Sequence, residues 1–233
     1  MSLSGGACLA IWNDVEPDRE TEYNHWHTRE HVPERCGVPG ILEGRRYVDA
    51  GSAHRRYLTL YDLRDLGVLS SAAYRDLIQA PTPWSAAMRP AFRNFLREPC
   101  TLLATAGTGT GGVAASVRFA LAKGAPPIIA AVARQAIALL AEEADLCAIA
   151  LGVVADAEPH PLALGAGGEP SGGSRGLLLV EAAMRSGLAR AEPGLVRAVT
   201  QAFDATEIEV KTYELVFSVR HPGSGPRAAF TGD

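Results

Sequence analysis

The sequence has little of what marks several large classes of protein. Its 233 residues include only four cysteines, which are scattered and form no Cys-x-x-Cys pair, and a net charge of −4 leaves no basic excess. Scattered cysteines argue against a disulfide scaffold or a structural zinc site and suit a reducing compartment. The lack of positive charge argues against nucleic acid as the main partner.

Long apolar segments are missing as well. No uncharged apolar run reaches the length that a membrane span needs, and the first ten residues lack the basic start and apolar core of a secretory signal peptide. The hydrophobic fraction of 47% and the charged fraction of 21% are those of an ordinary globular protein. We therefore expect a cytoplasmic protein without a membrane partner.

The sequence predicts the same order of strands and helices in its first and second halves. In the first part of the chain, hydrophobic patterns and turn residues predict strands over 7–13, 41–49, 54–63 and 100–104 and helices over 14–31, 68–79 and 84–96. In the second part they predict strands over 113–121, 146–155, 176–183 and 208–219 and helices over 127–143 and 187–203. Each part has the order β-α-β-β-α-β of the ferredoxin-like unit.

The predicted fold class is therefore α+β, built from tandem ferredoxin-like (βαββαβ) repeats. The first unit covers residues 1–106 and the second covers residues 113–221. A Gly/Thr-rich linker at 107–112 joins the two units, and a loose tail follows at 222–233.

The densest potential chemistry lies in residues 23–40, where three of the six histidines fall within seven positions. On a helix, His27, Glu30 and His31 share one face. That helix should end at about His31, because the next residue precedes Pro33 and is biased away from helical angles. Since histidine has the side-chain pKa nearest neutrality, the cluster predicts acid–base chemistry, with His31 as its central group.

Two other interpretations of this segment stay open. His27-Thr-Arg-Glu30-His31 matches HxxEH, the inverted signature of zinc proteases, in which two histidines bind the metal and the glutamate acts as a base. Such a site needs a third protein ligand and a metalloprotease scaffold, and ferredoxin-like units do not supply that scaffold. The other interpretation is a polar helix face exposed to solvent. The corresponding helix of the second unit, 127–143, carries no histidine, which favours one site per chain.

Two strands of the first unit carry further candidates. Arg45 and Tyr47 share one face of strand 41–49, whereas Arg46 points to the opposite face. An arginine on either face could bind an anionic group of a ligand.

The next strand and the second helical region add aromatic candidates. Tyr57, Thr59 and Tyr61 share one face of strand 54–63, which meets either the helices or the opposite side of the sheet. Trp84 follows a proline at the start of a predicted helix, and packing is the simplest role for it.

These residues also resemble a known family. The chain is similar to EthD-like proteins of the dimeric α/β-barrel type, which show the pattern W-x-x-x-E-H-x-P-E-R followed by V-P-G and R-R-Y. The matching residues here are Trp26, Glu30-His31-x-Pro33-Glu34-Arg35, Val38-Pro39-Gly40 and Arg45-Arg46-Tyr47. Tyr57-Leu-Thr-Leu-Tyr61 fits that family's third strand, and Thr82-Pro-Trp84 with Met88-Arg-Pro90 fits its second helical region. The resemblance covers roughly residues 7–105.

The resemblance implies two ferredoxin-like sheets that face one another as a barrel, with a cavity between sheet and helices. Relatives in the wider superfamily include cofactor-free monooxygenases, polyketide cyclases, lactone isomerases and haem-degrading enzymes. The haem-binding branch is a poor match, because no histidine here lies in a clear proximal-ligand context. The barrel could close within one chain or across a homodimer.

Together these observations predict a small-molecule enzyme without metal or organic cofactor, acting on an aromatic or polyketide-like compound. His31 is the expected acid–base group, with His27 beside it and Glu30 or a tyrosine as its orienting partner. The expected substrate-binding residues are Arg45, Arg46, Tyr47, Tyr57, Tyr61 and Trp84. The alternatives are a non-catalytic ligand-binding or stress-associated protein of the same fold, and a metal site at the HxxEH segment.

Overall fold

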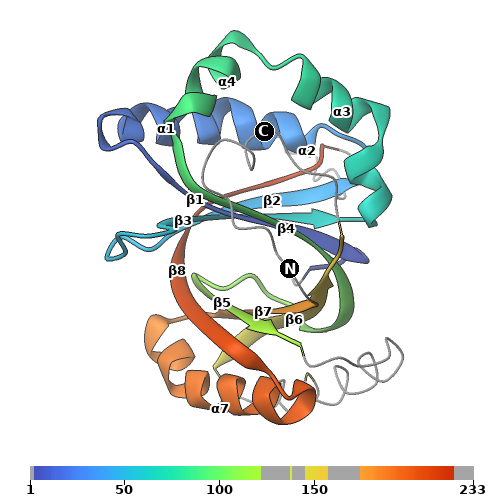
Figure 1. Cartoon of the computed structure of the whole chain (residues 1–233), viewed down its shortest axis with the longest axis vertical. Helices are drawn as coiled ribbons and strands as arrows, with labels where there is room; N and C mark the ends of the chain where they lie inside the picture. The colour runs from blue at the N-terminus through green and yellow to red at the C-terminus, as the bar shows by residue number, and fades with distance from the viewer. Residues whose placement is uncertain (1–2, 122–136, 138–144, 157–173, 223–233) are drawn as a thin grey trace, which may run out of the picture.

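The computed structural model describes residues 3–121, 137, 145–156 and 174–222. Eight antiparallel strands form a closed barrel, and helices cover its outer faces at two opposite ends (Figure 1). The strands are β1 (Ala7–Val15), β2 (Ile41–Val48), β3 (Tyr57–Leu63), β4 (Phe92–Gly107), β5 (Val113–Ala120), β6 (Leu146–Val154), β7 (Arg175–Ala182) and β8 (Thr206–Arg220).

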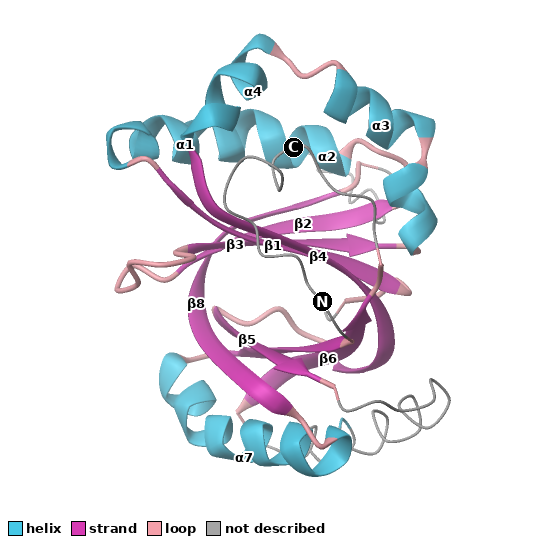
Figure 2. Cartoon of the chain, in the orientation of Figure 1, coloured by secondary structure: helices cyan, strands magenta, loops and turns pink. Residues whose placement is uncertain are grey.

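The helices lie outside the barrel, as Figure 2 shows in cyan. They are α1 (Glu20–Trp26), a π-helical turn (His27–His31), α2 (Val32–Cys36), α3 (Ala72–Gln79), α4 (Pro83–Met88) and α7 (Arg185–Phe203), with 3-10 turns at Pro17–Arg19, Leu66–Ser70 and Arg89–Ala91. No helix among the described residues is long and apolar enough to cross a membrane.

The strand order around the barrel is β1-β3-β2-β8-β5-β7-β6-β4. The first four strands lie in the order β4-β1-β3-β2, and the last four repeat it as β8-β5-β7-β6. The pairs β2·β8 and β4·β6 join the two sheets, so the barrel closes within the chain. The predicted α+β class is confirmed. The predicted helix at 127–143 lies outside the described residues except for Ile137, and so does almost all of the predicted tail at 222–233.

Side-chain alternation decides what each face of β3 contacts. Leu58 and Leu60 point into the barrel, where they pack with residues of the second sheet such as Leu179. Tyr57 and Tyr61 point outward to the helices. Of the two orientations that the sequence left open, the tyrosine row therefore faces the helices.

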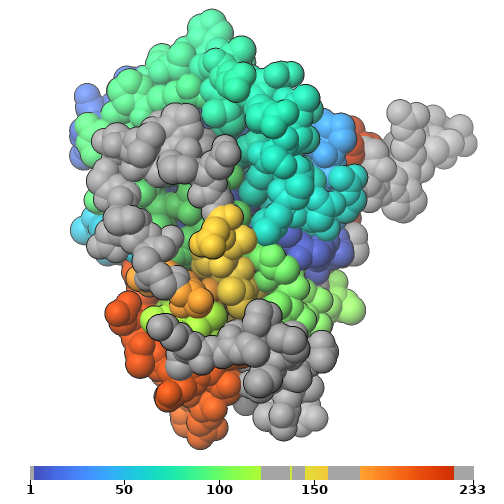
Figure 3. All heavy atoms as spheres, turned by 45° about the vertical axis from the view of Figure 1, so that its right-hand side comes forward, coloured from blue at the N-terminus to red at the C-terminus, as the bar shows by residue number. Residues whose placement is uncertain are grey.

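Helix α7 covers the second sheet in the way its sequence pattern requires. Its buried positions include Leu188, Ala191, Leu195, Val199 and Phe203, which recur at three- and four-residue intervals along one side of the helix. The larger of these side chains pack against the outer face of the second sheet. The equivalent layer on the first sheet runs from α1 to α4. In the space-filling view, the segment around α3 and α4 covers the upper end of the molecule (Figure 3).

The predicted helix 84–96 is partly wrong, because β4 already begins at Phe92. Asn94 has a left-handed backbone (φ 50°), and the pairing register between β1 and β4 shifts at this point. This bulge inserts one extra residue, so Phe92 and Phe95 bury their side chains in the same cluster although they are three positions apart. Three-residue spacing is also what a helix face produces, which explains the error.

Two buried arginine clusters connect the sheets inside the barrel. Arg118 on β5 donates two hydrogen bonds to Glu98 on β4, at 3.0 and 2.5 Å, and one to Glu209 at 2.7 Å. Arg45 on β2 donates to Glu181 on β7 at 2.6 Å. Both ion pairs join a residue of the first sheet to a residue of the second, so they fix how the sheets face each other.

Replacing Arg118 by Met should strongly destabilise the fold. Glu98 is 1% exposed, and removal of its partner leaves a buried carboxylate without compensation. We expect a loss of about 3–5 kcal/mol in the free energy of unfolding, measured by urea denaturation, and a much smaller loss in the double variant R118M/E98M. Equal losses in the single and double variants would contradict this account.

Candidate functional site

The helix that carries the histidines does not end at His31, where the sequence predicted its end. Residues 27–31 form a π-helical turn, in which the N–H of Val32 donates to the carbonyl of His27, and the chain continues as α2. In a regular α-helix the ring of Pro33 would clash with the carbonyl four residues earlier, and the wider turn gives that ring room. Helical structure therefore extends to Cys36, which corrects the predicted boundary at His31.

The π-helical turn stacks a row of rings on the inner side of this helix. The ring centroids of Tyr23 and His27 are 4.9 Å apart, and those of His27 and His31 are 5.1 Å apart with an angle of 18° between the rings. Trp26 lies beside both imidazoles, 5.3 Å from His27 and 4.4 Å from His31. The two histidines thus lie face to face within an aromatic cluster.

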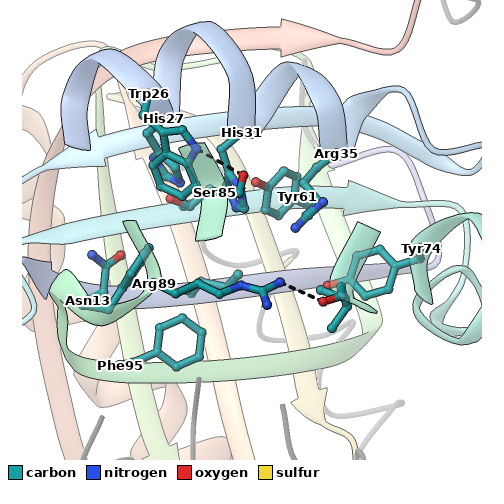
Figure 4. A pocket seen from close by; sticks show the side chains of 14 residues that line it. Asn13, Trp26, His27, His31, Arg35, Tyr61, Tyr74, Ser85, Arg89 and Phe95 are labelled. Carbon is teal, nitrogen blue, oxygen red and sulfur yellow. Dashed lines mark hydrogen bonds between the residues drawn. The ribbon is translucent and has the colours of Figure 1, made fainter. Parts of the chain in front are cut away.

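A pocket lies between this ring row, the outer face of β1 and β3, and the segment from α3 to β4. Figure 4 shows side chains from all these elements pointing into it. Its aromatic walls are Trp26, Tyr61, Tyr74, Phe92 and Phe95, and its polar groups are Asn13, His27, His31, Arg35, Thr59, Ser85 and Arg89. The cavity is narrow, about 50 Å³, compared with roughly 150 Å³ for an engineered apolar cavity that takes up benzene.

Two buried polar atoms of the pocket make no hydrogen bond with the described residues. They are Nδ1 of His27 and the hydroxyl of Tyr61, in side chains that are 3% and 2% exposed. Burial lowers the pKa of His27 well below its usual value, and the nearby positive charges of Arg46, His31 and Arg35 lower it further. Burial raises the pKa of Tyr61. Both groups are therefore neutral near pH 7 and available to a ligand.

Two arginines line the same cavity. The guanidinium of Arg35 lies 6.0 Å from the ring centre of Tyr74 and pairs with Glu34 at 3.1 Å. Arg89 donates a hydrogen bond to the carbonyl of Ile78 at 2.8 Å. In Figure 4 both guanidinium groups reach the part of the pocket between Tyr61 and Tyr74.

Glu30 does not line this cavity. One of its carboxylate oxygens accepts hydrogen bonds from Trp26 Nε1 at 3.2 Å, Thr82 Oγ1 at 2.5 Å and Ser85 Oγ at 3.2 Å. The carboxylate thereby holds the start of α4 against the histidine helix. The described part of the chain contains no group of three His, Cys, Asp or Glu side chains that could hold a metal ion, so the HxxEH donors do not converge.

The other candidates from the sequence are dispersed. Arg45 and Tyr47 lie inside the barrel, where both donate hydrogen bonds to Glu181. On the helix side, Arg46 donates to Thr28 Oγ1 at 2.6 Å. None of these residues lines the pocket.

Two aromatic candidates also have other partners. Tyr57 hydrogen-bonds with Glu20, and Trp84 donates to Glu22 at 3.1 Å on the outer surface. Of the six expected substrate-binding residues, only Tyr61 lines the pocket, together with His27 and His31.

Several pocket residues were not recognised from the sequence, above all Arg35 and Arg89. Both lie in segments that resemble the EthD-like pattern, Arg35 at the end of the Pro33-Glu34-Arg35 segment and Arg89 within Met88-Arg-Pro90. That pattern was the one signal in the sequence that could have indicated these two arginines as pocket residues. What it could not show is that α4 folds back over the sheet and brings the second segment to the first.

The buried neutral state of His27 predicts a specific pH dependence of stability. The unfolded chain protonates this histidine below about pH 6.5, whereas the folded chain does not, so stability is retained above that pH and lost as the pH falls. We expect replacement of His27 by Phe to reduce the slope of unfolding free energy by about 1 kcal/mol per pH unit between pH 6 and pH 5. Urea titrations at several pH values measure this slope. Identical slopes for the two proteins would rule out the neutral buried imidazole.

The position of Glu30 predicts a structural effect. Removing its carboxylate takes this acceptor away from Thr82 and Ser85, whereas Trp26 Nε1 keeps its second hydrogen bond, to Ser85 Oγ at 3.2 Å. We expect Glu30→Ala to lower the free energy of unfolding by about 2 kcal/mol and Glu30→Gln, which keeps one acceptor oxygen, by roughly half as much. Thermal and urea unfolding test this order. A loss confined to the Gln variant would be incompatible with the acceptor role.

Comparison with known proteins identifies solved structures of similar fold. No family model matches the chain, and no curated protein matches it significantly. Solved structures do match along nearly the whole length. An anthrone oxidase-like protein has a TM-score of 0.68 at 12% identity, with 98% of this chain and 99% of that chain covered.

Two further structures agree. A candidate monooxygenase from Lactobacillus acidophilus has a TM-score of 0.58 at 11% identity, covering 93% and 97% of the two chains. One from Fusobacterium nucleatum has a TM-score of 0.57 at 13% identity, covering 93% and 95%. At such identities the likeness concerns architecture: this chain has the fold of the ferredoxin-like α/β-barrel proteins.

Proposed function

We propose that the pocket is the active site of an enzyme that needs no metal or organic cofactor and acts on an aromatic or polyketide-like compound. The observation that carries this proposal is the placement of His27 and His31, which face a cavity walled by five aromatic side chains. Aromatic walls suit a planar ring system, and an imidazole at the edge of such a cavity suits proton transfer.

Cyclisation, isomerisation and oxygenation of such compounds share a first step, the removal of a proton from a carbon that is made acidic by an adjacent or conjugated carbonyl group. His31 is the base in our proposal, and Trp26 holds its ring from the side at 4.4 Å. The neutral His27 offers a hydrogen bond to the oxygen of the substrate. Glu30 acts indirectly, since it positions α4 and with it the Ser85 wall of the pocket.

Among these reactions we favour oxygenation, because one structure of similar fold is that of an anthrone oxidase-like protein. With anthrone as substrate, His31 would take a proton from the ring methylene, and the enolate would transfer electrons to O₂. The peroxide formed on that carbon takes the proton back and loses water, which leaves the second carbonyl. One anthrone and one O₂ thus give one anthraquinone and one water.

The narrow cavity implies that the pocket widens when a tricyclic compound enters. Two short elements form its outer wall, α3 with eight residues and α4 with six, and Glu30 is a main polar attachment of α4 to the rest of the molecule. A small outward movement of this wall enlarges the space without disturbing the barrel. Loops and short elements that cover active sites commonly move in this way.

We also infer that the chain belongs to the EthD-like family and consists of two tandem ferredoxin-like units, 1–106 and 113–221. The identical strand orders of the two sheets support the tandem units. The pocket positions of His31, Arg35 and Arg89 support the family, because all three come from its sequence pattern. The four free cysteines are in keeping with the expected cytoplasmic location.

The test uses anthrone as probe, with oxygen consumption and anthraquinone absorbance as readouts. We expect the protein to accelerate oxidation over buffer and expect His31→Ala to lower the rate about 10²-fold or more. His25→Ala is the matched control, since His25 lies on the same helix but is exposed and packs edge-on against Trp84. It should keep the full rate.

Other results point to the alternatives. Binding of anthrone without any turnover would replace this proposal by the non-catalytic ligand-binding one. An unchanged rate in His31→Ala would remove His31 from the mechanism. Stoichiometric zinc in the purified protein, lost in His27→Ala, would favour the metal site.

A further inference from the structure

We propose that the ligand of this pocket carries a carboxylate group, which Arg89 binds with the help of Arg35 and the hydroxyl of Tyr61. This inference rests on the proposed function, because it assigns a substrate class to the same pocket. It makes an aromatic carboxylate the compound that the site selects.

The first argument is the charge of the lining. Two arginines, Arg35 and Arg89, line the cavity, and none of the lining residues is an Asp or Glu. Glu34 pairs with Arg35 at 3.1 Å but does not line the cavity. A cavity that gathers cationic groups without a carboxylate in its wall is built for an anion.

The second argument is the incomplete pairing of Arg89. Among the described residues no carboxylate lies within ion-pair distance of its guanidinium, and its hydrogen bond goes to the neutral carbonyl of Ile78. Partial burial lowers the pKa of Arg89, and the positive charge of Arg35 lowers it further. Two guanidinium groups that repel each other across a cavity are relieved when an anion binds between them.

The third argument is the hydroxyl of Tyr61. It is almost fully buried, lines the cavity and makes no hydrogen bond with the described residues. Figure 4 shows it beside Arg35, at the end of the pocket that Arg89 reaches. A hydroxyl donor next to two guanidinium groups matches the acceptor oxygens of a carboxylate.

The arrangement also orients the ligand. The arginine and tyrosine donors lie toward α3, and the histidines with Trp26 lie farther along the helix row (Figure 4). A carboxylate fixed at the first end directs the ring system of the same molecule to His31. Anion binding and proton transfer therefore act on different parts of one substrate.

The experiment compares two probes of equal size, 2-naphthoate and the uncharged 2-naphthalenemethanol, by isothermal titration calorimetry. We expect the wild-type protein to bind naphthoate at least 10-fold more tightly than the alcohol. Arg89→Gln should weaken naphthoate binding 10- to 100-fold and change binding of the alcohol by less than 3-fold. Arg89→Lys should retain part of the preference, because it keeps the charge but loses the bidentate geometry.

Arg29→Gln is the control for charge alone, since Arg29 lies on the same helix as Arg35 but is exposed and does not line the pocket. It should bind both probes like the wild type. Equal affinities of the wild type for the two probes, equal losses for both probes in Arg89→Gln, or no binding of either probe would each overturn the proposal.

The experiments can contradict the catalytic role of His31 and the carboxylate site at Arg89 independently of each other. Carboxylate-selective binding that depends on Arg89, together with no anthrone turnover, would leave the anion site standing without the catalytic role of His31. Turnover that depends on His31, together with equal probe affinities, would leave the catalytic role and remove the anion site.

Discussion

The ion pairs inside the barrel are the constraint on which the rest of the structure depends. Arg45 and Arg118 are buried, and each meets a carboxylate from the opposite sheet. These ion pairs fix the register in which the strands of the two sheets pair. If a strand shifted by one residue, its arginine or glutamate would turn to the outer face and leave its partner buried and unpaired. These pairs and apolar side chains such as Leu58, Leu60 and Leu179 fill the interior, and the candidate pocket lies on the outer face of the first sheet.

Because side chains along a strand point alternately to its two faces, the same strands line both the barrel interior and the pocket. In β3, the leucines that fill the barrel separate Thr59 and Tyr61, which reach the opposite face and the cavity. The helix above contributes the imidazoles because its π-helical turn stacks His27 on His31. The chemistry of the site thus depends on two backbone features, the pleat of a strand and one widened helical turn.

The order of the described strands and the opposite faces of Arg45 and Arg46 could be predicted, because they depend on local patterns of apolar residues. The start of β4 could not, since the bulge at Asn94 imitates helical spacing. Nor could the role of Glu30, whose partners Thr82 and Ser85 are more than fifty positions away. His31 lines the pocket, and its catalytic role stays a prediction. The arginines were expected on β2, because only the packing of α4 brings Arg89 to the site.

The most direct test of the central claim, that the ligand binds between the helices and the outer face of the first sheet, is a crystal structure with anthraquinone-2-carboxylate. The account predicts electron density with the carboxylate within hydrogen-bond distance of Arg89 and the ring system beside His31 and Trp26. It also predicts an outward displacement of α4. Density for the ligand inside the barrel near Arg45, or on the surface with the pocket unchanged, would contradict the account.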